Sequence, residues 1–227
     1  MTLRTVGLLL VVAMAIPLVL VVLYRLFPPP LTPLMALRTM GYEATPKLPS
    51  PKSWQYHWVP LERISPTLPR AVIAAEDTTF CTHAGFDREA FTRAWEKYQA
   101  GEPTRGGSTI TQQAAKNAFL WPGRSAVRKA IETALTPVIE LIWGKRRIME
   151  IYLNIVEWAP GVYGAEAAAQ HHFHKSAQAL TPNESALLAA VLPSPRKWSA
   201  SKPGPYVESR IGAITTRATQ VSAACVK

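Results

Sequence analysis

The stretch AVIAAEDTTFCTHAGFD, residues 71–87, places two adjacent carboxylates, Glu76 and Asp77, directly after five apolar residues. Neighbouring side chains on a helix point about 100° apart, so the two acids cannot do the same job. A carboxylate beside apolar surface has its charged form disfavoured, which raises its pKa toward the range useful for a general base. Taken alone, the stretch favours a helix end with solvated acids. The rest of the chain decides against that interpretation.

The composition indicates an anionic partner. The 227-residue chain carries a formal net charge of +10, which suits a nucleic acid, an anionic membrane surface or a phosphorylated substrate. Its Trp and Tyr residues do not alternate with basic residues as in nucleic-acid binders, so we expect no nucleic acid. The two cysteines, Cys81 and Cys225, match no metal-ligand spacing. They are either two unpaired thiols or, outside the cytoplasm, a disulfide.

An uncharged segment near the N-terminus predicts a membrane anchor. Residues 6–24 contain no charged side chain and are long enough to span a bilayer. No small-x-small cleavage site follows, which favours a retained helix over a signal peptide. We therefore expect a cytoplasmic tail at 1–5, a transmembrane helix at 6–24, a proline-rich membrane-proximal linker at 25–52 and an exported domain at 53–227. Residues 34–40 could form a short helix, and residues 54–58 either an interfacial aromatic belt or a strand.

The exported part reads as mainly α. Helical periodicity begins at Leu61 and strand signals are few. Ser125 is placed to cap a helix that Pro137 should kink or split. Thr181 to Glu184 is a capping box that opens another helix, and residues 145–154 and 207–221 predict two more amphipathic helices.

A glycine-rich turn predicts an anion site. In the segment RGGSTITQQ, residues 105–113, two glycines give the backbone conformational freedom, and the residues after them begin a helix that continues through Lys116. Thr109 and Gln112 have capping-box spacing. Exposed amides, hydroxyls and a lysine at a helix N-terminus bind anions well, although the spacing is not that of a nucleotide P-loop. The alternative is an ordinary capped turn.

Two further patterns have open interpretations. Arg128 and Glu132 are four residues apart and lie on one helical face. They form either a surface ion pair or a pair in which the carboxylate holds a phosphate-binding arginine. The histidines at 171, 172 and 174 do not share one helical face, so we expect a surface run and no metal site.

Five motifs, in order, carry a resemblance to a known family. They are EDTTFCTHAGFD at 76–87, GGSTITQQAAKN at 106–117, RKAIETALTPVIE at 128–140 with KRRIMEIYLN at 145–154, GVYGAEAAAQHHFHK at 161–175 and LTPNESALLAAVLPSP at 180–195. The chain resembles the peptidoglycan glycosyltransferases, the transglycosylase module of class A penicillin-binding proteins, most closely in its stand-alone monofunctional form. No S-x-x-K, S-x-N and K-T-G set is present, so we expect no fused transpeptidase.

The resemblance implies a lysozyme-like helical domain with a small membrane-proximal lobe, held at the bacterial inner membrane with its catalytic side in the periplasm. It implies polymerisation of lipid II onto a growing lipid-linked glycan, with inversion and release of undecaprenyl pyrophosphate. Membrane lipids and other cell wall synthases are further expected partners. No cofactor is expected to be obligatory. Whether a divalent cation, Mg or Mn, binds the pyrophosphate is left open.

The resemblance also assigns roles to residues of this chain. Glu76 is the expected general base and Glu132 the second catalytic glutamate. The expected pyrophosphate-binding residues are Ser108, Thr109, Gln113, Lys116, Arg128 and Lys145. The expected supporting residues are Asp77, Phe80 and His83. The alternatives are a lytic muramidase and a membrane-tethered scaffold. A muramidase would share the catalytic glutamate but would not need the basic pyrophosphate-binding residues. A scaffold would not need the catalytic glutamate or those basic residues.

Overall fold

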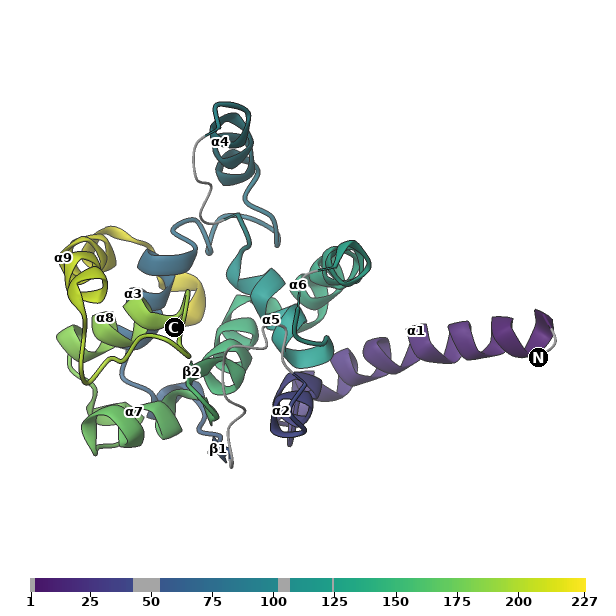
Figure 1. The fold of residues 1–227 in the computed structure, drawn as a ribbon, viewed down its shortest axis with the longest axis horizontal. Helices are drawn as coiled ribbons and strands as arrows, with labels where there is room; N and C mark the ends of the chain where they lie inside the picture. The colour runs from purple at the N-terminus through teal and green to yellow at the C-terminus, as the bar shows by residue number, and fades with distance from the viewer. Residues whose placement is uncertain (1–2, 43–53, 102–106, 124) are drawn as a thin grey trace.

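Most elements of the computed structural model are helices (Figure 1), as the sequence predicts. The structure describes residues 3–42, 54–101, 107–123 and 125–227. Outside them lie residues 1–2 of the predicted tail, 43–52 of the predicted linker, and residues 105–106 of the predicted anion-binding turn. The long elements are α1 (Leu3–Leu26), α2 (Pro33–Thr39), α3 (Thr67–Glu76), α4 (Arg88–Gln99), α5 (Ile110–Phe119), α6 (Ala126–Ile155), α7 (Ala165–Phe173), α8 (Pro182–Val191) and α9 (Pro205–Gln220). Short 3-10 turns are η1 (Leu61–Arg63), η2 (Ala177–Ala179) and η3 (Ala224–Val226).

Two groups of helices form the core. Helices α3, α8 and α9 pack on one another, and α5 packs along α6 (Figure 1). The two groups share one hydrophobic cluster, in which Ile73 of α3, Ile110 of α5 and Ile148 of α6 are fully buried. Burial of these apolar faces is the main stabilising term of such a bundle. The C-terminal end of α3 is therefore held close to α5.

Local capping places the helix starts where the sequence predicts them. Thr109 and Gln112 form a reciprocal capping box on α5, and Thr181 and Glu184 form another on α8. Ser125 accepts a hydrogen bond from the Arg128 backbone amide at the start of α6.

The break in the longest helix lies at a glycine. Of the two outcomes predicted at Pro137, a kink or a split, the split is wrong, because helix α6 continues through this proline. Pro137 is exposed, and a proline in a helix interior can be accommodated at the cost of one backbone hydrogen bond. The backbone instead leaves helical geometry at Gly144, with φ 68° and ψ 165°, a region that glycine enters without a steric penalty.

A small three-stranded sheet was not predicted. It has the order β1 (Gln55–Tyr56), β3 (Val162–Tyr163), β2 (Glu157–Ala159), with β1 parallel and β2 antiparallel to β3. Strand β1 confirms the strand interpretation of residues 54–58. Strands of two or three residues are too short to show an alternating pattern.

The C-terminal end of helix α1 packs on the rest of the domain. Trp143 donates from Nε1 to the Val21 carbonyl at 2.7 Å, and Arg147 donates to the Tyr24 carbonyl at 2.7 Å. Helix α2 confirms the predicted short helix and packs on α5. Among the described residues, no helix combines the length and apolarity that crossing a bilayer requires. The helix over residues 6–24 is confirmed, and its insertion in a membrane stays a prediction.

Candidate active site

Glu76 is the last residue of α3, where a buried helix meets a polar loop. The preceding residues of α3, from Ala71 to Ala74, are buried, whereas Glu76 is partly exposed. Its Oε2 accepts a hydrogen bond from Gln113 Nε2 at 2.9 Å. Burial raises the pKa of the Glu76 carboxyl, and the bond from Gln113 opposes that rise. The Glu76 carboxylate is thus partly buried and is bonded by one amide of α5.

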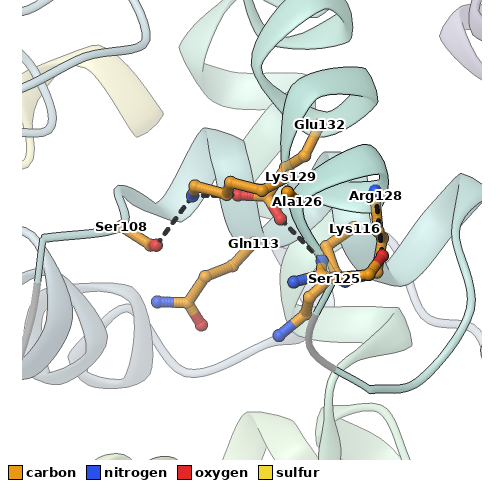
Figure 2. A pocket seen from close by; sticks show the side chains of 8 residues that line it. All are labelled: Ser108, Gln113, Lys116, Ser125, Ala126, Arg128, Lys129 and Glu132. Carbon is orange, nitrogen blue, oxygen red and sulfur yellow. Dashed lines mark hydrogen bonds and ion pairs between the residues drawn. The ribbon is translucent and has the colours of Figure 1, made fainter.

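A cavity of about 650 Å³ lies beside Gln113, between α5 and the start of α6 (Figure 2). Its charged side chains are three cations and one carboxylate. The lining residues are Ser108, Gln113, Lys116, Ser125, Ala126, Arg128, Lys129 and Glu132. A cavity with this excess of positive charge fits an anion.

Glu132 organises the cations of the cavity. Its Oε2 accepts from Arg128 Nη1 at 2.8 Å, and its Oε1 accepts from Lys129 Nζ. Lys129 Nζ also donates to Ser108 Oγ at 3.1 Å, which ties the glycine-rich turn to α6. Arg128 and Glu132 are both buried, so the surface-pair interpretation of their spacing is wrong.

Lys116 is the third cation. Burial lowers the pKa of its ammonium group, and the nearby Glu132 partly opposes that shift. An anion in the cavity would favour the charged form of Lys116. Thr109, the other residue expected in this group, caps α5 and is not among the residues that line the cavity.

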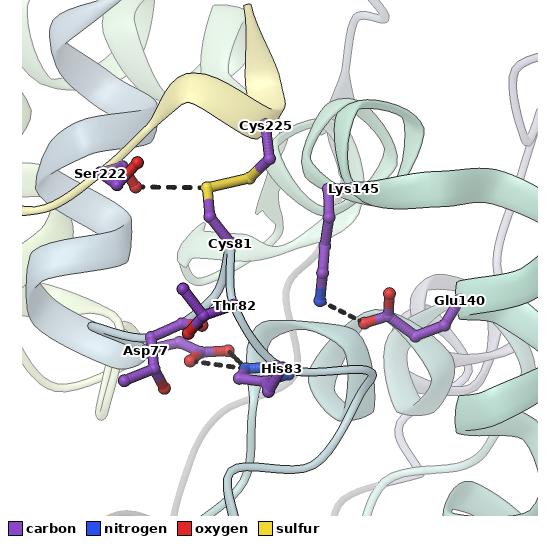
Figure 3. The surroundings of a disulfide bond; sticks show 9 residues. Asp77, Cys81, Thr82, His83, Glu140, Lys145, Ser222 and Cys225 are labelled. Atoms are coloured by element: carbon purple, nitrogen blue, oxygen red, sulfur yellow. Dashed lines mark hydrogen bonds and ion pairs between the residues drawn. A yellow bond between two sulfur atoms is a disulfide. The ribbon is translucent and has the colours of Figure 1, made fainter.

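Lys145 lies elsewhere. Its Nζ donates to Glu140 Oε1 at 2.6 Å and stands 4.5 Å from the centre of the Phe80 ring. Glu140 Oε1 also accepts from Thr111 Oγ1 at 2.6 Å. Figure 3 shows the Lys145–Glu140 pair near the loop that follows Glu76. Lys145 therefore packs on Phe80 of that loop and does not line the cavity.

A disulfide also holds the loop that follows Glu76. Cys81 and Cys225 are bonded, with their Cα atoms 5.5 Å apart (Figure 3). The bond decides between the two alternatives left open by the sequence. It ties the loop that follows Glu76 to the turn η3, across 144 positions of the chain.

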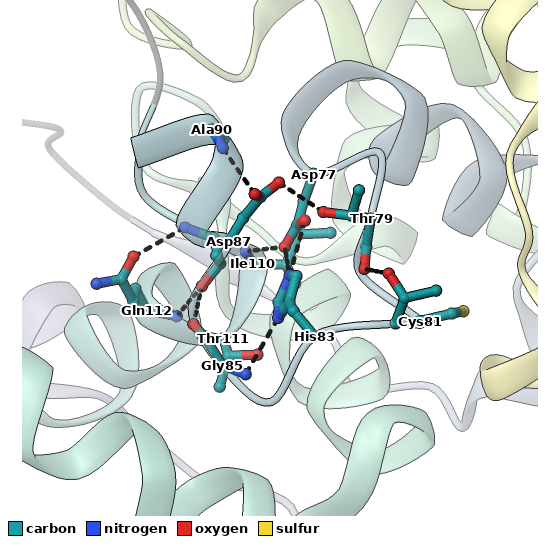
Figure 4. Close-up of polar contacts among 12 residues, drawn as sticks. Asp77, Thr79, Cys81, His83, Gly85, Asp87, Ala90, Ile110, Thr111 and Gln112 are labelled. Atoms are coloured by element: carbon teal, nitrogen blue, oxygen red, sulfur yellow. Dashed lines mark hydrogen bonds and ion pairs between the residues drawn. The ribbon is translucent and has the colours of Figure 1, made fainter. Parts of the chain in front are cut away.

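The Asp77 carboxylate fastens the same loop to α5 (Figure 4). Its Oδ2 accepts from the Ile110 backbone amide at 2.9 Å, and its Oδ1 accepts from His83 Nε2 at 2.9 Å. His83 Nδ1 in turn accepts from the Gly85 amide at 3.1 Å. The Gly85 carbonyl accepts from Thr109 Oγ1 at 2.7 Å. Each bond joins the loop to itself or to the start of α5, which keeps Glu76 beside Gln113.

The histidine run differs from the prediction at one position. His172 is buried, and its ring nitrogens lie 3.4 Å from Ser201 Oγ and 3.4 Å from the Trp158 carbonyl. Helix α7 turns this side chain inward, and burial lowers its pKa. In the described ranges, no group of three or more His, Cys, Asp or Glu side chains is placed to hold a metal ion.

Three residues of the site were not predicted. Lys129 lies in the cavity, Glu140 holds Lys145, and Tyr152 contacts Gln113. The adjacent basic pair at 128–129 could have indicated Lys129. The contact of Tyr152 with Gln113 spans 39 positions of the chain and the contact of Glu140 with Thr111 spans 29, so no local pattern in the sequence indicates either one.

A family model described as transglycosylase matches residues 45–219. The chain belongs to the transglycosylase family. This confirms the resemblance carried by the five motifs. The "Biosynthetic peptidoglycan transglycosylase" of Caulobacter vibrioides is 53% identical over 202 residues, which cover 89% of this chain and 84% of that protein. The protein of the same name from Rhodospirillum centenum is 47% identical over 222 residues, covering 96% of this chain and 90% of that protein.

Replacing Asp77 should release the loop from α5. Asp77→Ala leaves the buried Ile110 amide and the His83 ring without their acceptor, so we expect a loss of about 2 to 4 kcal/mol in the free energy of unfolding. Urea unfolding of the detergent-solubilised protein measures it. Thr82→Ala, an exposed change in the same loop, is the control. Equal stability of the two variants would contradict this role.

Breaking the disulfide should destabilise the domain. Closing so long a loop restricts the unfolded chain, so reduction should lower the free energy of unfolding by about 2 to 4 kcal/mol. Urea unfolding with and without a reductant is the measurement. The double variant Cys81→Ser with Cys225→Ser should be insensitive to reductant. If the reductant leaves the original chain equally stable, the disulfide does not have this role.

Proposed function

We propose that this chain polymerises lipid II, a disaccharide-pentapeptide on undecaprenyl pyrophosphate, into linear β-1,4 glycan strands. The observation that carries the proposal is the adjacency of a base and an anion site. Gln113 bonds the Glu76 carboxylate and lines the cavity that holds Lys116, Arg128 and Lys129. The names of the two relatives and the family match support the same reaction class.

Glu76 acts as the general base in this mechanism. It takes the proton from the sugar 4-hydroxyl of the acceptor, lipid II, as that oxygen attacks the anomeric carbon of the donor chain. The bond from the anomeric carbon to the pyrophosphate breaks, with inversion from α to β. A raised pKa suits Glu76, because its carboxylate must hold the proton that it accepts.

The cavity receives the leaving pyrophosphate. Negative charge develops on the departing oxygens, and fixed cations stabilise it most where water is excluded. Arg128 can offer two parallel donors to phosphate oxygens, and the negative phosphate charge favours the charged form of Lys116 beside them. Glu132 serves as the second glutamate by holding Arg128 and Lys129 in place. Lys145, held by Glu140, braces the loop that follows Glu76 by lying over the Phe80 ring.

We further propose that the segment over residues 6–24 anchors the domain in the bacterial inner membrane, with residues 53–227 in the periplasm. The absence of charged side chains from that segment supports insertion. The Cys81–Cys225 bond supports export, because disulfides persist in oxidising compartments and are rare in the cytosol. A lipid-linked substrate would then reach the cavity from the bilayer.

The proposal assigns no step to a metal ion or other cofactor. A divalent cation, Mg or Mn, on the pyrophosphate remains compatible with it, but the described side chains offer no cluster of three ligands for such an ion. The substrate partners are lipid II and the growing lipid-linked glycan. Association with other cell wall synthases remains a prediction, and nucleic acid has no part in the proposal.

Removing the base should abolish polymerisation. Glu76→Gln keeps the shape of the side chain but cannot accept the hydroxyl proton, so we expect a folded protein that makes no glycan from labelled lipid II. Gel separation of the labelled polymer is the measurement. Glu208→Gln, on the exposed face of α9, is the matched control and should retain activity. Polymer made by Glu76→Gln would overturn the base assignment.

Removing Arg128 should weaken the hold on the pyrophosphate. Hydrogen bonds from a charged donor contribute about 1.5 to 3 kcal/mol, so Arg128→Ala should lower kcat/KM by roughly tenfold to a hundredfold. Initial rates over a range of lipid II concentrations provide the measurement. Arg63→Ala, exposed on η1, should have normal kinetics. Normal kinetics in Arg128→Ala as well would refute the role.

A further inference from the structure

A buried tyrosine lies behind the glutamine that contacts Glu76. Tyr152 Oη donates to Gln113 Oε1 at 3.1 Å, and Gln113 Nε2 donates to Glu76 Oε2 at 2.9 Å. The three residues come from α6, α5 and α3. They form one continuous chain of hydrogen bonds from the core to the proposed base.

The direction of this chain depends on the tyrosine. A glutamine amide has an accepting oxygen at one side and donating hydrogens at the other. Because Tyr152 donates to the oxygen of Gln113, the NH₂ group faces the Glu76 carboxylate. The reversed amide would present its oxygen to an ionised carboxylate, and the two oxygens would repel each other.

Tyr152 is well suited to hold that direction. Its side chain is fully buried, so the hydroxyl gains a great deal from a protein partner. Burial raises the pKa of the Tyr152 phenol well above its usual value. The hydroxyl therefore keeps its hydrogen and remains a donor over the whole range in which a carboxylate base titrates.

We propose that Tyr152 is a positioning residue for the reaction, which holds the Gln113 amide so that it stabilises the ionised carboxylate of Glu76. This inference rests on the proposed function of Glu76 as the base. Tyr152 touches neither the substrate nor the reacting atoms in this account. It acts through Gln113 alone.

Tyr152→Phe replaces none of the other charged groups that act on Glu76. They are Lys116 of α5 and Arg210 of α9, which favour the ionised form, and the neighbouring Asp77, which disfavours it. Tyr152→Phe removes one oxygen and keeps the ring. A change in the titration of Glu76 in that variant would therefore report the orientation of the Gln113 amide.

The test compares Tyr152→Phe in two backgrounds, the original chain and Gln113→Leu. The base works in its ionised form, so the rate rises with pH through the pKa of Glu76. Losing the hold on the amide should move the midpoint of that rise upward by about half a unit to one unit. Isotope-edited NMR titration of the Glu76 carboxyl, assigned by its loss in Glu76→Gln, should show the same shift. In the Gln113→Leu background, where no amide remains to be held, the NMR midpoint should not move further.

Replacing Tyr152 by a fluorinated tyrosine, a stronger donor of nearly the same shape, should move the midpoint downward. This second variant keeps the test decisive if Tyr152→Phe folds poorly. An unmoved midpoint in a folded variant, or equal shifts in both backgrounds, would overturn the positioning role. Polymer made by Glu76→Gln would instead overturn the proposed base itself, so the two failures are distinguishable.

Discussion

The Asp77 carboxylate is the contact on which the site depends. It accepts from the first amide of α5 and from His83, and so joins the loop after α3 to the helix that carries Gln113 and Lys116. An anionic side chain at a helix N-terminus is also favoured by the helix dipole. Glu76 precedes Asp77 and points elsewhere, because adjacent side chains diverge. One acid of the pair is therefore structural, which leaves the other available for chemistry.

Burial shifts the two sides of the site in opposite senses. It raises the pKa of Glu76 and lowers that of Lys116, since each charged form loses its hydration. In the proposed reaction a hydroxyl would deliver to Glu76 the proton that burial favours, and a pyrophosphate beside Lys116 would favour the charged form that burial disfavours. Arg128 and Lys129 are paired with the Glu132 carboxylate in the absence of substrate. In the proposed reaction, these cations would be in place before the leaving group departs.

The sequence predicts those features that depend on a few neighbouring residues. The helix caps at Thr109, Ser125 and Thr181 follow from local hydrogen bonds and are confirmed. Features that need distant segments were missed or left open. The pairing of Cys81 with Cys225 and the contact of Tyr152 with Gln113 exist because the fold brings remote residues together. The i, i+4 spacing places Arg128 on the face of Glu132, but only the packing of α5 on α6 buries the pair. Helix α6 breaks at Gly144 and not at Pro137. Local sequence rules permit a break at either residue, so they could not decide between them.

The central claim is that the Glu76 carboxylate and the adjacent cationic cavity join sugars with release of a lipid pyrophosphate. The most direct measurement incubates the purified full chain in detergent with labelled lipid II and analyses the product. The account predicts a long labelled polymer that a muramidase digests, with undecaprenyl pyrophosphate released for each sugar pair joined. Lipid II left unchanged under conditions where the protein is folded, or cleavage of preformed glycan instead of its synthesis, would contradict it.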